Sequence, residues 1–398
     1  MRIAVIGAGI GGLVAAAGLQ RQGHEVHVFE RRAEPGAVGA GITLGGNAFA
    51  ALDDIGLGDV VRGVSGSALG SMRSGQRQPS GRWLVSLPPS ETSPMRSMHR
   101  VELHHALLAE LAAGSVHADS RAQVAPDGEP EIEVTVGAES PECPGNPSAG
   151  TTRRERFDLV IAADGLRSAA RSAWGLDPGV RFAGYTAWRG VTESAGHLAD
   201  EVGETWGRGA RFGIVRLPDD RVYWFAALST PAGAVFADDR AAARDIFGGW
   251  HEPIAELIEA TPRAAILRHD IYDLARFPHS FVVRRGVLLG DAAHAMTPDL
   301  GQGAGQAIED AATLVLLLGG ASAEAVVGAG LDAVVQRYSR LRRARTRPLW
   351  RGSHAMGRIA QARGSIVSRV RDAALRSIPG PLVARAAATA GTPGWPRP

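Results

Sequence analysis

The feature that most restricts the fold of this chain is a βαβ unit within residues 2–32, RIAVIGAGIGGLVAAAGLQRQGHEVHVFERR. An apolar β-type run at residues 3–6 leads into a glycine-rich turn, an alanine-rich helical segment at 13–21 and a second apolar run at 26–29. A strand, a helix and a parallel strand together need about 30 residues, which is the length available here. The sequence therefore predicts an α/β domain with a parallel sheet.

The turn between the first strand and the helix has the spacing Gly7-x-Gly9-x-x-Gly12. In a dinucleotide-binding fingerprint, the first glycine allows the tight turn and the second lets a pyrophosphate approach the backbone. The third lets the helix pack close to the sheet, so that the phosphates face the positive end of the helix. The alternative is a glycine turn in an α/β unit that binds nothing.

The second strand ends in an acid, Glu30, about 20 residues after the glycines, where a carboxylate can accept hydrogen bonds from a ribose. A solvated surface acid is the alternative interpretation. The predicted dinucleotide site comprises Gly7, Gly9, Gly11, Gly12, Glu30 and Arg31.

Length and composition narrow the class of protein. With 398 residues, the chain exceeds what one hydrophobic core usually serves, so we expect two domains. A net charge of +2 and the lack of a basic block interleaved with aromatics argue against nucleic-acid binding. The single cysteine, Cys143, cannot form an internal disulfide, which favours a cytoplasmic location. No run of about 18 apolar residues exists, so we predict no membrane span.

The remaining chain alternates between α/β and β-rich segments. Residues 100–113 are helical in pattern, 131–136 alternate like a strand, and 157–165 form a buried strand that ends in Asp-Gly. Residues 180–285 are β-rich and aromatic. We predict a discontinuous dinucleotide-binding domain, an inserted β-rich substrate domain and a C-terminal helical segment. Their ranges are 1–70, 97–176 and 270–340 for the first, 71–96 and 177–269 for the second, and 341–398 for the third.

A second motif, GVLLGDAAHAMTPDLGQGAGQAIEDA at residues 286–311, puts an acid and several glycines where a strand gives way to a helix. It resembles the second FAD fingerprint of the flavoprotein aromatic hydroxylases, the p-hydroxybenzoate hydroxylase-like class A monooxygenases. DLVIAADGLRSAAR, GAGITLGGNAFAALDDIGL and HRVELHHALL resemble further motifs of that family, in the same order. The resemblance implies the family's fold, a Rossmann-type FAD-binding domain with an inserted β-sheet substrate domain and C-terminal helices.

The resemblance also implies roles for particular residues. Asp291 would bond the ribityl hydroxyls of FAD, and the helix from about residue 303 would point its N-terminus at flavin N1 and C2=O. Arg100 would contact FAD, and Asp164 would lie near both FAD and the reduced nicotinamide. Arg167 and Arg171 would orient Asp164 or meet NAD(P)H, or else be simple charges on a helix surface. The flavin ring would lie along Pro298, Gly301, Gly303, Ala304 and Gly305, and the backbone of Val124 would bind adenine.

The chemistry implied is that of a single-component monooxygenase. NADH or NADPH reduces FAD, and the reduced flavin adds O2 to give a C4a-hydroperoxide that hydroxylates or epoxidises an aromatic or heteroaromatic molecule. A halogenase or reductase on the same scaffold is one alternative, although the Trp-x-Trp-x-Ile-Pro segment of such halogenases is missing. A nucleotide-binding protein that has lost its flavin is the other.

Two substrate-side residues, Arg211 and Tyr223, are expected on the two arms of a hairpin around the sequence LPDDR. Their spacing is similar to that in the urate hydroxylase branch of the family, where an Arg and a Tyr touch or polarise the substrate. A one-residue change of register would send either side chain to the other face. Trp188 and Trp224 are expected in the core more than in a pocket.

The remaining expectations concern metals and partners. His294 and the His104–His105 pair are predicted to be structural, with no metal site, because no metal-type spacing accompanies them. The arginine-rich segment 337–374 is predicted to be a solvated or subunit-contacting helix in preference to a membrane-surface helix. The expected partners are a small aromatic substrate and O2, without nucleic acid or membrane, in a monomer or homodimer.

Overall fold

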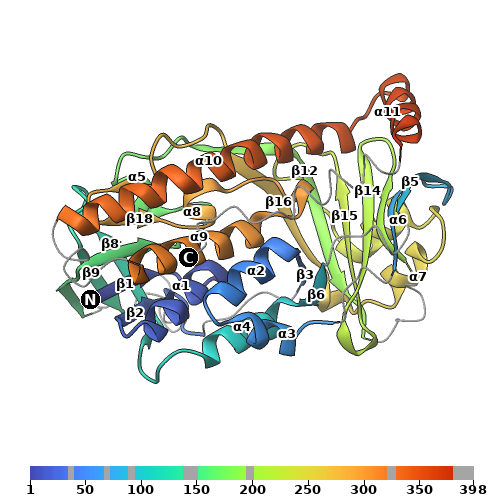
Figure 1. The fold of residues 1–398 in the computed structure, drawn as a ribbon. Helices are drawn as coiled ribbons and strands as arrows, with labels where there is room; N and C mark the ends of the chain where they lie inside the picture. The colour runs from blue at the N-terminus through green and yellow to red at the C-terminus, as the bar shows by residue number, and fades with distance from the viewer. Residues whose placement is uncertain are drawn as a thin grey trace.

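The fold is taken from a computed structural model, which describes residues 1–34, 40–66, 72–87, 95–137, 151–193, 201–320 and 329–379. Two large sheets lie at opposite ends of an elongated molecule, with a long helix along one edge (Figure 1). Cys143, on which the predicted cytoplasmic location rests, lies outside the described residues, so that location stays a prediction. None of the described helices combines the length and the hydropathy needed to cross a bilayer.

The first sheet has six strands in the order β17-β18-β11-β1-β2-β7, all parallel except β17. Its apolar strands are buried, as parallel strands between two layers must be. The predicted βαβ unit is confirmed: β1 is followed by helix α1 (Ile10–Arg21) and by β2. The strands are β1 (Arg2–Ile6), β2 (Glu25–Phe29), β7 (Val116–His117), β11 (Leu159–Ala162), β17 (Val282–Val283) and β18 (Gly286–Leu288).

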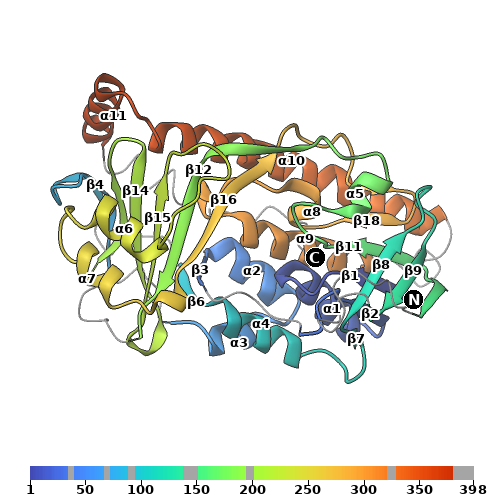
Figure 2. The same ribbon diagram turned by 180° about the vertical axis from the view of Figure 1, so that it is seen from behind.

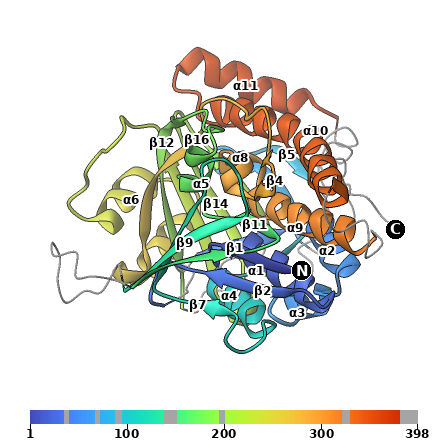
Figure 3. The same ribbon diagram turned by 90° about the vertical axis from the view of Figure 1, so that its left-hand side faces the viewer.

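Helix α9 (Gly303–Gly319) packs against α1 on one side of this sheet, and a three-stranded antiparallel sheet lies on the other side (Figure 3). The small sheet consists of β8 (Ser120–Val124), β9 (Glu131–Val136) and β10 (Thr152–Arg156). Around these layers lie α2 (Gly46–Asp54), α3 (Gly58–Gly63), α4 (Arg100–Ala109), α5 (Ala169–Ala173) and α8 (Asp291–His294). The helix predicted at 100–113 therefore ends earlier than expected.

The second large sheet has seven strands in the order β16-β12-β15-β14-β13-β4-β5. The hairpin predicted around LPDDR is confirmed as β14 and β15, joined by the 3-10 helix η4 (Pro218–Asp220). The strands are β4 (Arg73–Arg77), β5 (Trp83–Leu87), β12 (Val180–Val191), β13 (Glu201–Trp206), β14 (Ala210–Arg216), β15 (Val222–Leu228) and β16 (Leu267–Leu274).

One face of the seven-stranded sheet is closed by α6 (Asp239–Phe247) and α7 (Ile254–Glu259), with the 3-10 helix η5 (Arg263–Ala265) leading to β16 (Figure 2). Trp188 and Trp224 lie on this face and are fully buried among α6 and α7, which confirms that both belong to the core. The opposite face is directed at the six-stranded part of the molecule. That opposite face is the one left uncovered by α6 and α7.

The two parts are joined by a β3 (Gly41–Leu44) and β6 (Arg96–His99) pair and by the C-terminal helices. Helix α10 (Ala329–Ala360) runs along one edge of the molecule, and α11 (Ser365–Ser377) stands at its end (Figures 1 and 2). The 3-10 helix η6 (Pro298–Leu300) packs against α10 and lies between the two large sheets. The exact domain boundaries stay a prediction.

Candidate functional site

The glycine turn after β1 is held by the packing of the six-stranded sheet. Gly7 has φ +104°, and its N–H donates to the Phe29 carbonyl at 2.8 Å. A Cβ on Gly7 would lie 2.5 Å from the carbonyl oxygen of Ala163 on the neighbouring strand segment, and one on Gly12 would collide with the Gly7 carbonyl. A Cβ on Gly11 would press on Leu289. These glycines are thus required by the turn itself.

Gly9 differs from its neighbours because it faces open space. Among the described residues, no heavy atom lies within 4 Å of a Cβ built on Gly9. Its backbone is extended, and it directly precedes α1 as the N-cap, without a side chain to satisfy the first N–H groups. The positive end of α1 therefore points into open space, where it can bind an anion.

Glu30 lies beside this turn and is bound by backbone donors. Its Oε2 accepts from the Ala8 N–H at 2.9 Å, and Oε1 accepts from the Arg32 N–H at 3.0 Å. An ionised carboxylate has about four lone-pair positions, so capacity for further donors is left. Arg31 follows with an exposed side chain. The solvated-acid alternative for Glu30 is weakened, because the carboxylate fixes the glycine turn.

Asp164 follows the end of β11, next to the glycine turn. Its Oδ2 accepts from the Ala170 N–H at 3.1 Å, while Oδ1 is buried and has no hydrogen-bond partner among the described residues. An unpaired buried carboxylate oxygen is costly. This oxygen is therefore available to a ligand that donates a hydrogen bond.

Arg171 is buried and connects the Asp164 loop to α8. It donates to the Leu166 carbonyl at 2.7 Å and to the Ala292 carbonyl at 3.0 Å. A third donation, from Nε to Asp177 at 3.0 Å, completes its contacts, so Arg171 holds the two loops together. Arg167 is exposed instead, with its guanidinium 5.6 Å from the Tyr272 ring.

Asp291 begins α8 after Gly290, and its side chain is exposed to a space that Arg100 also borders. Desolvation of the Arg100 guanidinium lowers its pKa, and the Asp291 carboxylate opposes this shift. Arg189 from β12 lowers the same pKa further, while Tyr223 from β15 raises it. Asp291 of α8 and two residues of the seven-stranded sheet therefore act on the Arg100 guanidinium, which places it where the two parts meet.

The loop from η6 into α9 also presents glycines to open space. Gly301 has φ +63°, and no described heavy atom lies within 4 Å of a Cβ on Gly301 or Gly303. Pro298 is exposed, Ala304 is half-buried, and Gly305 is buried near Asn47. The long helix α9 begins at Gly303, so its positive end lies at this open surface.

Two residues that the sequence did not single out hold this loop. Asn47 on α2 donates through Nδ2 to Gln302 Oε1 at 3.1 Å and to Glu309 Oε1 at 2.6 Å. Gln302 is the N-cap residue of α9. Asn47 lies within GGNAF, which is part of a sequence that resembles a family motif. Only the packing of α2 on α9 shows which groups this asparagine binds.

A buried ionic network lies behind the loop. Arg342 of α10 pairs with Asp310 at 2.5 Å and with Glu309 at 2.8 Å, and all three are fully buried. Asp310 also accepts from the Gly290 N–H at 2.8 Å and from His294 Nε2 at 2.6 Å. Desolvation raises the pKa of Asp310, but His294 and Arg342 lower it more, so it lies below its usual value. The network connects α10 to the segment that carries Asp291.

His104 and His294 are held by protein groups, whereas His105 is exposed. His104 Nε2 donates to the Ala8 carbonyl at 2.8 Å, and His294 belongs to the network just described. Among the described residues, no group of three or more His, Cys, Asp or Glu side chains is arranged to hold a metal ion. Val124 is half-buried at the end of β8, the edge strand of the three-stranded sheet.

Arg211 and Tyr223 share one face of the seven-stranded sheet, the face opposite α6 and α7. Arg211 pairs in register with Ala227 and Tyr223 with Val215, which places both side chains on the same side. Arg189 Nη1 donates to the Tyr223 hydroxyl at 2.9 Å. The Tyr223 ring packs directly on Gly41, where a side chain would collide with it.

Arg211 is buried and bound to a residue of the glycine loop. It forms an ion pair with Asp299 of η6 and a second with Glu204 at 3.6 Å. The Tyr185 hydroxyl donates to Asp299 at 2.9 Å. Burial raises the pKa of Tyr185, with Arg211 opposing the shift, so its hydroxyl stays protonated. Arg211 Nε is buried and unpaired among the described residues.

Sequence reasoning placed Tyr185 and Arg189 on one face of a strand but gave them no role, and it did not single out Asp299. Asp299 stands inside the second motif, directly after Pro298, and could have been noted there. Its pairing with Arg211 joins residues 88 positions apart, which no local pattern reports.

Comparison with known proteins assigns the family. Residues 1–353 match the family described as FAD binding domain. The chain is 36% identical to aurachin C monooxygenase/isomerase of Stigmatella aurantiaca over 94% of each protein. It is also 36% identical to the FAD-dependent urate hydroxylase of Klebsiella pneumoniae, over 79% of this chain and 80% of that one. This chain belongs to the FAD-dependent aromatic hydroxylases.

A solved structure supports the same conclusion for the whole fold. Klebsiella pneumoniae HpxO in complex with FAD and uric acid superposes with a TM-score of 0.82 at 28% identity, covering 98% of this hydroxylase and 96% of that chain. The hydroxylase is therefore an FAD-dependent monooxygenase that uses NADH or NADPH and O2. The class A fold predicted from the sequence is confirmed.

The residues of the hydroxylase fit FAD. Gly9 and Gly303 face open space at the positive ends of α1 and α9, which suits a diphosphate at one and an electron-rich ring edge at the other. The unpaired Asp164 Oδ1 and the exposed Asp291 offer acceptors to ligand hydroxyl or amide donors. Arg100 supplies a positive charge that interacts with Asp291. The glycines that face open space, the hydrogen-bond acceptors and the positive helix ends together match a long dinucleotide.

Proposed function

We propose that this hydroxylase acts on a fused heteroaromatic ring that carries a carbonyl or hydroxyl group. The observation that carries the proposal is the polar face formed by Arg189, Tyr223 and Arg211, which lies opposite the glycine loop. Urate hydroxylase and aurachin C monooxygenase, the relatives named above, are oxygenases, which favours hydroxylation over the halogenase, reductase and non-catalytic alternatives.

FAD held by the glycine turns, Glu30 and Asp291 would supply the redox chemistry: it would accept a hydride from NADH or NADPH and would activate O2, so that one oxygen atom goes to an electron-rich ring and the other leaves as water. The side chains orient that ring and keep a proton available. The Tyr223 hydroxyl accepts from Arg189, so its own proton is free to go to a substrate oxygen. The positive charge of Arg189 favours the ionised form of a ring hydroxyl, which is more electron-rich.

We assign Arg211 a role on the substrate side and a second role in holding the glycine loop in place. Its pairing with Asp299 fixes η6 against the seven-stranded sheet, so the glycine loop and the substrate face are held at a constant separation. Its unpaired Nε–H is the donor left for a substrate oxygen. The cofactor assignment proposed for the glycine turns, Glu30, Arg31, Arg100, Val124, Asp164, Asp291 and the 298–305 loop is that of the sequence analysis.

The proposed activity is tested with purified holoenzyme, NADH and NADPH, and a panel of phenols, indoles, quinolones and purines. We expect substrate-stimulated NAD(P)H oxidation with at least one fused heteroaromatic compound, and a product heavier by one oxygen atom that comes from labelled O2. Stimulation by simple phenols alone would contradict the proposed substrate class.

Asp291→Ala is expected to weaken FAD binding by about 10- to 100-fold, because hydrogen bonds to a charged acceptor contribute about 1.5–3 kcal/mol. The measurement is the FAD dissociation constant of the apoprotein, from quenching of flavin fluorescence. Asp332→Ala, which removes an exposed carboxylate of α10, serves as the control and should bind FAD normally. Unchanged affinity in Asp291→Ala would remove the ribityl assignment.

Arg211→Gln is expected to retain FAD but to lose substrate-stimulated NAD(P)H consumption by about 10- to 100-fold, the effect of removing one charged hydrogen bond. Steady-state oxidation of NAD(P)H with and without substrate measures this loss. The control is Arg216→Gln, since Arg216 lies on the same strand but pairs at the surface with Asp220 at 3.0 Å. Normal stimulation in Arg211→Gln would exclude Arg211 from the substrate site.

A further inference from the structure

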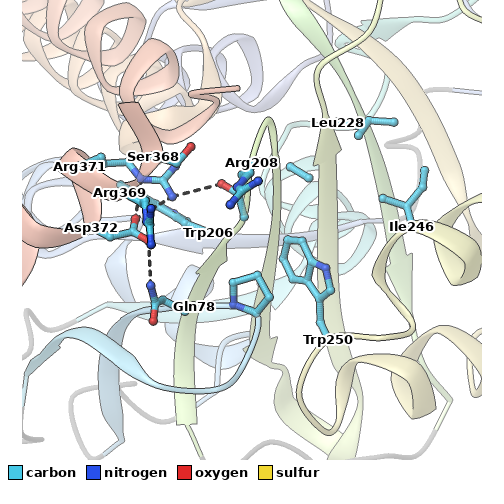
Figure 4. Close-up of a pocket in the computed structure, with 13 residues that line it drawn as sticks. Gln78, Trp206, Arg208, Leu228, Ile246, Trp250, Ser368, Arg369, Arg371 and Asp372 are labelled. Carbon is cyan, nitrogen blue, oxygen red and sulfur yellow. Dashed lines mark hydrogen bonds and ion pairs between the residues drawn. The ribbon is translucent and has the colours of Figure 1, made fainter. Parts of the chain in front are cut away.

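Helix α11 is attached to the protein by its polar side. Arg371 is buried, donates to the Ala360 carbonyl at 3.0 Å and to the Gly207 carbonyl at 3.1 Å, and lies 5.5 Å over the Trp206 ring. Asp372 accepts from Gln78 Nε2 at 2.8 Å. Figure 4 shows these side chains at the border of a hollow of about 620 Å³ between α11 and the seven-stranded sheet.

The apolar side of α11 points away from the protein. Ile366, Val367 and Val370 are 75%, 60% and 63% exposed, and Ala373 and Ala374 continue the same stripe. A surface helix of a globular protein normally turns its apolar stripe toward the core. Of the seven large apolar side chains that are exposed in the described chain, five lie within residues 359–378: Ile359, Ile366, Val367, Val370 and Ile378. The exposed apolar surface is therefore concentrated here.

The adjoining surface of α10 is basic. Five exposed arginines recur at helical spacing along its outer side, and two more flank the apolar stripe of α11. Only two acids, Asp332 and Asp372, occur in residues 329–379. Among the described residues, none of these seven arginines has an ion-pair partner: Arg337, Arg340, Arg347, Arg351, Arg358, Arg369 and Arg376. We call this the α10–α11 face; α10 and α11 lie along the same edge (Figures 1 and 2).

The arginines and the apolar stripe of the α10–α11 face together indicate what kind of partner would bind there. A second copy of the chain would bring like charges together, because Arg369 and Arg376 flank the stripe on both copies. Nucleic acid would satisfy the arginines, but it offers nothing to a stripe of aliphatic side chains. An anionic lipid surface satisfies both, since phosphate headgroups attract arginine while the apolar side chains enter the headgroup boundary.

We propose that the α10–α11 face docks the hydroxylase on an anionic membrane surface. Docking uses the outer side of both helices and leaves the polar anchor of α11 on the protein unchanged. The proposal differs from the sequence-based prediction of a solvated or subunit-contacting helix, which stays a prediction. The proposal does not depend on the substrate class proposed above.

The test is sedimentation of the holoenzyme with vesicles of phosphatidylcholine alone and of phosphatidylcholine with phosphatidylglycerol. We expect a pelleted fraction only with the anionic vesicles, and its loss when salt is raised to about 0.5 M, because screening shortens the reach of the arginines. The double variant Val367→Ser/Val370→Ser should lower the partition coefficient about tenfold. Val235→Ser is the matched control, because Val235 is 88% exposed but lies outside the α10–α11 face.

Four outcomes would overturn the proposal. They are absence of binding to both kinds of vesicle, equal binding to neutral vesicles, and equal losses for the double variant and Val235→Ser. The fourth is a dimer, seen by light scattering, that the double variant dissociates. Binding of RNA or DNA that the serine variants leave unchanged, without vesicle binding, would assign the face to nucleic acid. Flavin content and melting temperature, measured on every variant, show whether the fold is retained.

Discussion

Arg342→Met is expected to lower the free energy of unfolding by about 3–5 kcal/mol, because it leaves two buried carboxylates without their cation. Arg342 pairs with Glu309 and Asp310, and all three side chains are fully buried. Methionine fills a similar volume but cannot neutralise either acid. Urea unfolding at pH 7 with saturating FAD measures the loss, which should appear as a lower midpoint at an unchanged slope.

The matched control is Arg351→Met on the same helix. Arg351 is exposed, and a surface substitution there should change the free energy of unfolding by no more than about 0.5 kcal/mol. Because Asp310 also holds Gly290 and His294, the Arg342 variant should lose FAD more readily as well. Equal unfolding midpoints for the two variants would show that the buried network does not stabilise this fold.

Gly9→Val is expected to abolish FAD retention while leaving the apoprotein folded. The Gly9 backbone is extended, a conformation that valine adopts, and no described heavy atom lies within 4 Å of the new Cβ. The side chain would instead occupy the space before the N-terminus of α1, where the diphosphate is proposed to bind. The flavin-to-protein ratio after desalting and urea unfolding of the apoprotein measure the two effects separately.

Gly63→Val provides the comparison for this experiment. Gly63, at the end of α3, also has no described heavy atom within 4 Å of its Cβ position, but it lies outside the proposed cofactor cradle. This variant should keep its flavin. A Gly9→Val protein that purifies with a full complement of FAD would contradict the placement of the diphosphate at α1.

Much of the site was accessible to sequence reasoning because its signals are local. The turn at Gly7 and Gly12, the acid at Glu30 and the strand-to-helix junction at Asp291 each depend on a few adjacent residues. The sheet face of Arg211 and Tyr223 was accessible through strand alternation, once the register was known. The Arg211–Asp299 pair was not accessible to sequence reasoning, since the η6 loop that carries Asp299 must meet the face of the seven-stranded sheet that carries Arg211.

Arginine posed the hardest problem for the sequence. Arg342, Arg351 and Arg371 lie within 30 residues of one another, yet the first and third are buried and the second is exposed. A guanidinium is equally suited to a carboxylate, a backbone carbonyl or solvent, so its residue type does not reveal its environment. Only the positions of Glu309, Asp310 and the Gly207 carbonyl separate the buried arginines from the outward ones.

The sequence by itself determined the βαβ unit, the two glycine-rich turns, the β-rich insertion and, through the order of its motifs, the flavoprotein family. Backbone geometry and strand or helix period are short-range properties, and a few residues suffice to encode them. The tertiary structure alone decided which acid Arg211 binds, which arginines are buried and that α11 turns its apolar side outward. Those outcomes depend on contacts between segments that are distant in the chain. Which side chains are desolvated, and which charges are paired, depends on the groups that the packing brings together.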